Sequence, residues 1–190
     1  YANSSGLSLE SQLVNQKIEW SREEISRIFG VRPKQIIFTG SATESNNLLL
    51  REFYRRKKSK TFRVLCSPFE HPSVAEPLKR FSETEITLLK SARSGAIEAP
   101  SLNHAMDLAV IMAIQNESGI VLPLSDLVPR FQNEKIPVLA DASQLLPKLC
   151  EDGPAHLQPA FIRSLTDSGC YVTATGHKVG AGFGAGLVIA

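Results

Sequence analysis

The chain has 190 residues, of which 43% are hydrophobic and 21% are charged, which suits one large globular domain. The net charge of +2 excludes a strong overall attraction to nucleic acid or to an anionic membrane surface. No apolar run approaches the length of a membrane span, so we expect no membrane partner.

Helices and short apolar strands are expected to alternate along the chain. The hydrophobic periodicity predicts helices over residues 8–29, 43–56, 73–81 and 124–132. Short apolar runs predict strands over 35–38, 62–65, 85–89, 108–114, 137–140, 171–173 and 186–190. This alternation is typical of an α/β fold with an open, mostly parallel sheet and helices on both faces.

Polar residues follow several of these predicted strands. In open α/β sheets, ligands bind beyond the carboxyl ends of the strands. Strands ending at Phe38, Leu65, Ile114 and Ala140 should therefore deliver the residues that follow them to one edge of the sheet. The residues delivered there are Ala42, Thr43, His71, Asn116, Asp141 and Gln144.

Gly40-Ser41-Ala42-Thr43 joins a predicted strand to a predicted helix. Small residues there allow backbone N–H groups to approach an anion, which the helix dipole also favours. Alternatively, Thr43 could cap the predicted helix, which would explain the same residues without any ligand. The segment is not a Walker loop, because no G-K-[S/T] sequence follows it.

Asp141 and Lys178 are the residues that most suggest cofactor chemistry. Asp141 ends a buried strand, where an unpaired charge is costly, and a protonated pyridine nitrogen would be a suitable partner. A helix cap is the alternative role for Asp141. Lys178 could form a Schiff base in a desolvated site, or it could be a surface lysine before a glycine-rich loop.

His71 and Asn116 each have a functional and a plain structural interpretation. The imidazole of His71 could stack on a pyridine ring, or His71 could be a polar loop residue. Asn116 could donate to a ring oxygen or to a substrate carboxylate, or it could simply belong to a turn at a strand end.

The cysteines and the basic residues indicate neither a metal site nor a nucleic-acid site. Cys66, Cys150 and Cys170 are odd in number and show no C-x-x-C spacing, which argues against a disulfide framework or a zinc site. We expect reduced thiols in a cytoplasmic protein, since the polar first residues show no signal-peptide pattern. The basic run at 55–58 is expected to be a solvated helix end.

Several segments, taken in order, resemble those of class V aminotransferase-like enzymes that use pyridoxal 5'-phosphate, and most closely the cysteine desulfurases. The similar segments are Ala42-Thr43-Glu44-Ser45-Asn46-Asn47, Glu70-His71, Asn116-Glu117-Ser118-Gly119-Ile120, Asp141-Ala142-Ser143-Gln144 and Thr175-Gly176-His177-Lys178. The resemblance covers nearly the whole chain. It implies the large domain of the fold type I class of pyridoxal-phosphate-dependent transferases.

The resemblance also implies a role for each site residue. Lys178 would hold the cofactor covalently, Asp141 would bind the pyridine nitrogen, and His71 would stack on the ring. Gln144 and Asn116 would face the phenolic oxygen. The phosphate would be held by Ala42, Thr43, Thr175 and His177. Lys178 and His71 would be the catalytic residues, and no metal is expected.

In the complete enzyme, the resemblance implies conversion of L-cysteine to L-alanine with sulfur transfer. This activity belongs to sulfur metabolism and iron–sulfur cluster assembly, with a homodimer and a possible sulfur-acceptor protein as partners. Residues 1–190 are expected to be part of the large domain, without the N-terminal arm and the small C-terminal domain, and so to be inactive alone. The segment from Asp141 to Lys178 is longer than in the family, with extra residues around 151–168.

Two alternatives stay open. The complete protein could be a selenocysteine lyase or another class V lyase or aminotransferase that uses the same cofactor. The chain could also be a non-catalytic truncated product or interaction fragment that keeps only the fold.

Overall fold

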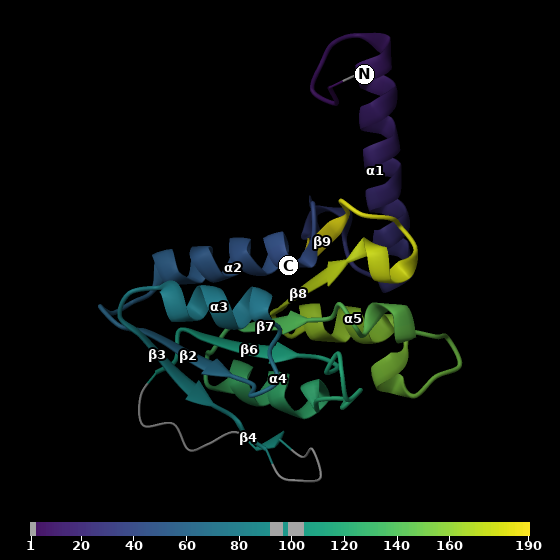
Figure 1. The fold of residues 1–190 in the computed structure, drawn as a ribbon. Coiled ribbons are helices and arrows are strands. Elements are labelled where there is room, and N and C mark those ends of the chain that lie inside the picture. Colours follow the sequence, from purple (N-terminus) through teal and green to yellow (C-terminus); the bar gives the residue numbers. More distant parts are fainter. Residues whose placement is uncertain (1–2, 92–96, 99–104) are drawn as a thin grey trace.

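The computed structural model describes residues 3–91, 97–98 and 105–190 (Figure 1). Its helices are α1 Leu9–Phe29, α2 Ala42–Arg56, α3 Pro72–Arg80, α4 Leu124–Asn133 and α5 Pro159–Asp167. The main sheet contains β1 Ile36–Thr39, β2 Phe62–Cys66, β3 Thr84–Leu88, β6 Leu108–Met112, β7 Val138–Asp141, β8 Cys170–Thr175 and β9 Gly186–Ile189. A small separate sheet pairs β4 Lys90–Ser91 with β5 Ile97–Glu98.

The main sheet has seven strands in the order β1-β9-β8-β7-β6-β2-β3. The pairs β8–β7, β7–β6, β6–β2 and β2–β3 are parallel, and β9 runs antiparallel to both of its neighbours, β1 and β8. The predicted α/β class with a mostly parallel sheet is therefore confirmed. The carboxyl ends of β6, β7 and β8 lie at one edge, which is where such sheets bind ligands.

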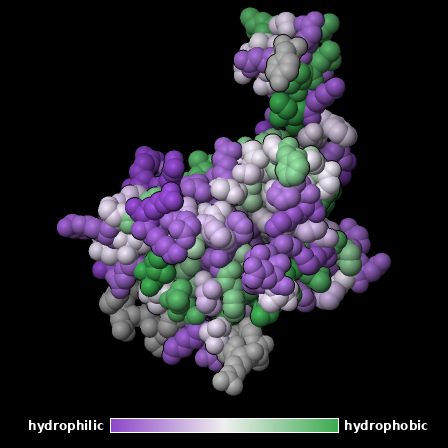
Figure 2. All heavy atoms as spheres, viewed as in Figure 1, coloured by the Kyte–Doolittle hydropathy of each residue, from purple (hydrophilic) through white to green (hydrophobic). Residues whose placement is uncertain are grey.

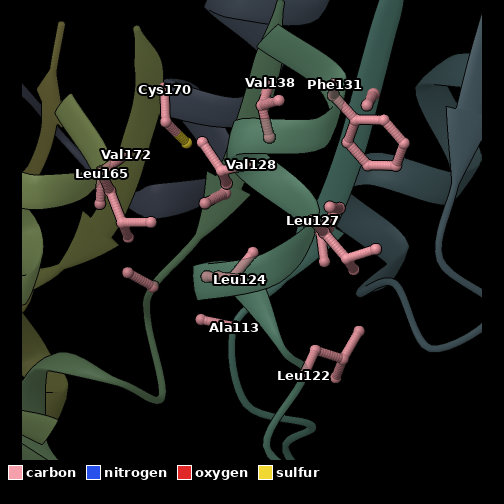
Figure 3. Close-up of a cluster of buried hydrophobic side chains, with 14 of the residues drawn as sticks. Ala113, Leu122, Leu124, Leu127, Val128, Phe131, Val138, Leu165, Cys170 and Val172 are labelled. Carbon is pink, nitrogen blue, oxygen red and sulfur yellow. The ribbon is translucent and has the colours of Figure 1, made fainter. Parts of the chain in front are cut away.

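Helices cover both faces of the sheet and bury a separate hydrophobic cluster on each. Leu50 of α2 and Leu78 of α3 pack into the cluster on one face. Phe131 of α4 and Leu165 of α5 pack into the cluster on the other face, which Figure 3 shows. Because the central strands are covered on both sides, Leu108–Met112 is buried along its whole length.

Helix α1 projects from this body, with its N-terminal end far from the sheet (Figure 1). It begins after Ser8, whose side chain caps the first turn, and ends at Gly30, which takes the left-handed conformation with φ of 66°. Leu9, Leu13 and Trp20 on this helix are 67%, 49% and 63% exposed, and apolar side chains are visible along the projection (Figure 2).

The structure differs from the predicted elements in several places, and the small sheet of β4 and β5 is one that was not predicted. Helix α5 occupies part of 151–168, where no element was predicted, because its nine residues follow a Gly- and Pro-containing stretch and give only a short periodic signal. The strand predicted over 108–114 ends at Met112, since Ile114 leaves the ladder and bridges Val121 instead. Within the described residues, no helix has the length and apolarity that crossing a bilayer requires.

Candidate functional site

The carboxyl ends of β6, β7 and β8 and the first turns of α2 and α3 surround one pocket. Every site residue predicted from the sequence lines it: Ala42, Thr43, His71, Asn116, Asp141, Gln144, Thr175, His177 and Lys178. The lining also includes residues that were not predicted as site residues: Ser41, Ser73, Met112, Ile114 and Ser143. The predicted convergence is thus present, while the role of each residue toward a ligand stays a prediction.

The N-terminus of α2 forms one wall of the pocket. Ser41 caps the helix by accepting a hydrogen bond from the backbone N–H of Glu44 at 3.1 Å. Ser41 lies directly over the sheet at Gly186, where an added Cβ would come within 2.4 Å of the Ser41 carbonyl carbon. Because Gly186 pairs with Thr175, the first turn of α2 and the end of β8 meet at this point. The helix is therefore capped, but the cap is Ser41 and not Thr43, which lies in the first turn of α2. An N-terminus of this kind suits an anion, because its first-turn N–H groups lack partners within the helix.

Asp141 is 4% exposed and ends β7. Its Oδ1 accepts the backbone N–H of Ser143 at 2.9 Å, and its Oδ2 accepts Nδ2 of Asn46 at 3.0 Å. The first bond makes a local turn, since the segment after Asp141 is not an α-helix but leads to a short 3-10 turn at Leu146–Lys148. Neither bond is to a cationic group, so the buried carboxylate still lacks a positive partner among these contacts.

His71 is the N-cap residue of α3, and its ring borders the pocket. The ring Nδ1 accepts the backbone N–H of Ser73 at 3.1 Å and lies 2.9 Å from the Ser73 hydroxyl. His71 is therefore a structural cap as well as a pocket residue. The ring nitrogen left for the pocket is Nε2.

Lys178 lies on the 3-10 turn Gly176–Val179 directly after β8, where it is half-buried and lines the pocket. On the same turn, Nδ1 of His177 lies 2.8 Å from the Thr175 hydroxyl. The turn thus brings an amine and two polar groups to the pocket beside the end of β8.

Asn116 and Gln144 lie in turns after β6 and β7. Asn116 belongs to a turn in which the side-chain oxygen of Gln115 accepts the backbone N–H groups of Glu117 and Ser118 at 2.7 and 2.5 Å. Gln144 accepts a hydrogen bond from the amine of Lys148 at 3.0 Å and lines the pocket. Asn116 is therefore a turn residue, as one interpretation held, and it also reaches the pocket.

Comparisons with known proteins identify the family. Residues 1–190 match the model of the family described as aminotransferase class-V. The chain belongs to this family. It is 28% identical to the "IscS-like cysteine desulfurase" of Mycobacterium tuberculosis, covering 98% of this chain and 48% of that protein. It is 30% identical to the mitochondrial cysteine desulfurase of Saccharomyces cerevisiae, covering 71% of this chain and 28% of that protein.

Solved structures agree with this family assignment. The structure titled "SspA in complex with cysteine" has a TM-score of 0.83 and 26% identity, covering 100% of this chain and 53% of that chain. DndA from Streptomyces lividans has a TM-score of 0.78 and 26% identity, covering 98% of this chain and 51% of that one. The chain thus spans about half the length of these proteins and of the Mycobacterium relative.

Members of this class-V family use pyridoxal phosphate, and the pocket has features that fit it. Asp141 supplies a buried negative charge for a cationic ring nitrogen, and the N-terminus of the 15-residue helix α2 suits a phosphate. The buried hydroxyl of Ser143, which lines the pocket, has no hydrogen-bond partner among the described residues. An unpaired polar atom of this kind is costly unless a ligand or water satisfies it.

Proposed function

We propose that this chain is the cofactor-binding part of a cysteine desulfurase, which in its complete form converts L-cysteine to L-alanine and transfers the sulfur. The observation that carries the proposal is that buried Asp141, the ring of His71 and the amine of Lys178 line the same pocket. The cysteine desulfurases among the relatives and the neighbour described in complex with cysteine support it.

Pyridoxal phosphate, when bound, supplies an electron-poor pyridinium ring that accepts electrons released from the substrate. The carboxylate of Asp141, which lines the pocket, would hold the protonated ring nitrogen and keep the ring cationic. The amine of Lys178 would hold the aldehyde group, and the imidazole of His71 would lie against the ring, since both residues line the pocket. These are the assignments that we propose for Lys178 and His71 as catalytic residues.

The remaining pocket residues orient the cofactor. The first-turn N–H groups at Ala42 and Thr43, together with Thr175 and His177, would hold the phosphate at the N-terminus of α2. Asn116 and Gln144 also line the pocket and would donate hydrogen bonds to the phenolic oxygen. Holding the cofactor at several points fixes the reacting atoms and contributes to catalysis by orientation.

The partners and the compartment of the complete protein are also proposals. A homodimer is supported by the exposed apolar residues along α1, and sedimentation of the complete protein would test it. A sulfur-acceptor protein within iron–sulfur cluster assembly follows from the proposed activity. A cytoplasmic location is supported by the three free cysteines, although relatives in yeasts are mitochondrial, and cell fractionation would decide.

A different reaction on the same cofactor is the main alternative. Selenocysteine lyase or another class V lyase or aminotransferase would use the same cofactor contacts, because the residues described above would hold the cofactor and not the substrate side chain. Comparing cysteine, selenocysteine and amino-donor substrates on the complete protein separates these reactions.

A non-catalytic fragment is the second alternative. In this case the chain would keep the fold of the family but form no product. A folded chain that takes up no pyridoxal phosphate would favour this alternative over the proposed function.

Borohydride reduction of the chain with added pyridoxal phosphate, followed by peptide mapping, tests the site. We expect the pyridoxyl label on Lys178, since Lys178 and Asp141 line the same pocket. Lys178→Arg should abolish the label and the associated absorption band. Lys148→Arg is the matched control. Lys148 donates a hydrogen bond to Gln144 of the pocket lining, but its amine should not be needed for labelling. A label on Lys148 or Lys135 would contradict the assignment.

A further inference from the structure

Asn46 lies in the second turn of α2, outside the pocket lining, and has no exposed surface. Its side chain contacts three residues of the surrounding elements. Nδ2 lies 3.0 Å from Asp141 Oδ2 and 3.0 Å from Ser73 Oγ, and Oδ1 lies 2.6 Å from Thr173 Oγ1. Asn46 therefore joins the end of β7, the start of α3 and β8 behind the pocket.

The chemistry of these partners determines which way the Asn46 amide faces. An ionised carboxylate only accepts hydrogen bonds, so the group facing Asp141 must be the NH₂ group. One hydrogen of that group goes to Asp141 and the other to Ser73 Oγ, while Oδ1 accepts the hydroxyl of Thr173. The reversed amide would place two acceptors against each other in a buried position, which is costly.

This orientation also directs the hydroxyl of Ser73. Because Ser73 Oγ accepts from Asn46, its own proton is available for His71 Nδ1 at 2.9 Å. The backbone N–H of Ser73 donates to the same Nδ1 at 3.1 Å. A backbone N–H can only donate, so Nδ1 is an acceptor and carries no proton.

We propose that Asn46 is a positioning residue that acts through the Ser73 hydroxyl, alongside the backbone N–H of Ser73, to hold His71 as the neutral tautomer with its proton on Nε2. His71 then offers the pocket a hydrogen-bond donor and not an acceptor. The importance of this for the reaction rests on the proposed function, which places His71 beside the cofactor. The same amide fixes one oxygen of Asp141, so one buried side chain orients two groups of the site.

The tautomer can be read directly from long-range ¹H–¹⁵N correlation spectra of the imidazoles in the ¹⁵N-labelled chain. The chain has four histidines, and His71→Gln identifies the His71 signals. In the wild type, we expect Nδ1 to show the resonance of an unprotonated, hydrogen-bonded nitrogen and Nε2 that of a protonated one. A proton on Nδ1 would overturn the proposal.

Two variants test whether Asn46 is responsible. Asn46→Ala should shift the His71 Nδ1 resonance toward that of a less hydrogen-bonded nitrogen and raise the share of the other tautomer about fivefold, the effect of losing one ordinary hydrogen bond. Ser73→Ala removes the hydroxyl that links Asn46 to His71, and it should cause the same shift of the Nδ1 resonance. The double variant should add nothing further, since both residues act through one bond.

Thr173→Val is the matched control, because it removes a hydrogen bond of Asn46 but leaves the contact with Ser73. Its His71 signals should match those of the wild type. His71 signals that are identical in the wild type and in Ser73→Ala would overturn the proposal even if Asn46→Ala does not fold. These spectra need neither cofactor nor turnover, so failure to bind pyridoxal phosphate would count against the proposed function alone.

Discussion

The Glu70 side chain does not line the pocket but holds together two segments beside it. Its Oε1 accepts the hydroxyl of Ser67 and the backbone N–H of Met112, both at 2.5 Å, so it ties the loop after β2 to the end of β6. Its Oε2 is shielded from solvent and lacks a hydrogen-bond partner in the described part of the chain. Burial, with a smaller contribution from the charge of Asp141, raises the pKa of Glu70 from 4.5 to about 8.

This raised pKa predicts that Glu70 makes the chain less stable as the pH rises. Between pH 4.5 and about 8 the folded chain keeps a proton that the unfolded chain releases, so the free energy of unfolding falls by about 1.4 kcal/mol per pH unit. The stabilisation by the neutral acid is complete below the unfolded pKa and is lost as the pH rises through the folded one. Glu70→Gln cannot titrate and should remove this slope.

Urea unfolding at about pH 5 and about pH 7 checks the prediction. Relative to Glu70→Gln, the wild type should lose roughly 3 kcal/mol over these two pH units. Glu76→Gln is the control, since Glu76 is exposed and pairs with Lys79. Equal pH dependence in the wild type and in Glu70→Gln would show that Glu70 is already ionised in the folded chain.

At the same scale, nine of the fourteen pocket-lining residues could be predicted from the sequence, but the residues behind them could not. His71, Asp141 and Lys178 follow strands, and strand ends share an edge whatever the details of packing. Asn46 contacts residues 27, 95 and 127 positions away, and no local pattern specifies such contacts. Its only signal was its place within the Ala42–Asn47 segment.

At the scale of elements, β9 determines how closely α2 approaches the sheet. Gly186 starts this antiparallel strand and pairs with Thr39 on one side and Thr175 on the other. A Cβ on Gly186 would lie 2.4 Å from the carbonyl carbon and 2.7 Å from the nitrogen of Ser41. Backbone atoms cannot yield as a flexible side chain can, so this glycine permits the contact between the helix N-terminus and the sheet.

Gly186→Ala should therefore displace the N-terminus of α2. We expect overpacking to lower the free energy of unfolding by about 1–3 kcal/mol. Pyridoxal phosphate should also bind more weakly, because the displaced helix N-terminus would hold its phosphate less well. Urea unfolding and a cofactor titration measure the two effects. Gly40→Ala is the matched control, because its Cβ would meet only the flexible end of Glu44, at 3.0 Å. Equal effects of the two substitutions would contradict the role given to Gly186.

The order of strands and helices was predictable because long elements, such as α1 and α2, contain enough residues to show a clear apolar periodicity. Helix α5 was not predicted, since it begins at Pro159 after a turn-rich segment and buries only a few side chains, among them Ile162 and Leu165. The antiparallel direction of β9 was not predicted either. The short glycine-rich connection from β8 to β9 favours a return in the opposite direction, whereas a parallel neighbour needs a longer crossover.

At the scale of the whole molecule, the described chain forms the sheet, both helix layers and one pocket edge. Its thiols lie apart from that pocket: Cys66 and Cys170 are buried in strands, and exposed Cys150 is not part of the pocket lining. Burial raises the pKa of the Cys66 thiol, and it raises the pKa of Cys170 to about 12. Both buried thiols are therefore protonated at neutral pH and poor nucleophiles.

The 190-residue chain alone should consequently show negligible cysteine desulfurase activity, even with pyridoxal phosphate bound. The reaction needs a thiolate that reaches the substrate sulfur and a cation that orients the substrate carboxylate, and the pocket contains no cysteine among its described lining residues. An assay with free L-cysteine and added cofactor should release no more sulfide and alanine than the cofactor alone. Cys66→Ser, Cys150→Ser and Cys170→Ser should leave that background unchanged. Robust sulfide release that any one of these substitutions abolishes would contradict the prediction and show that the chain carries its own nucleophile.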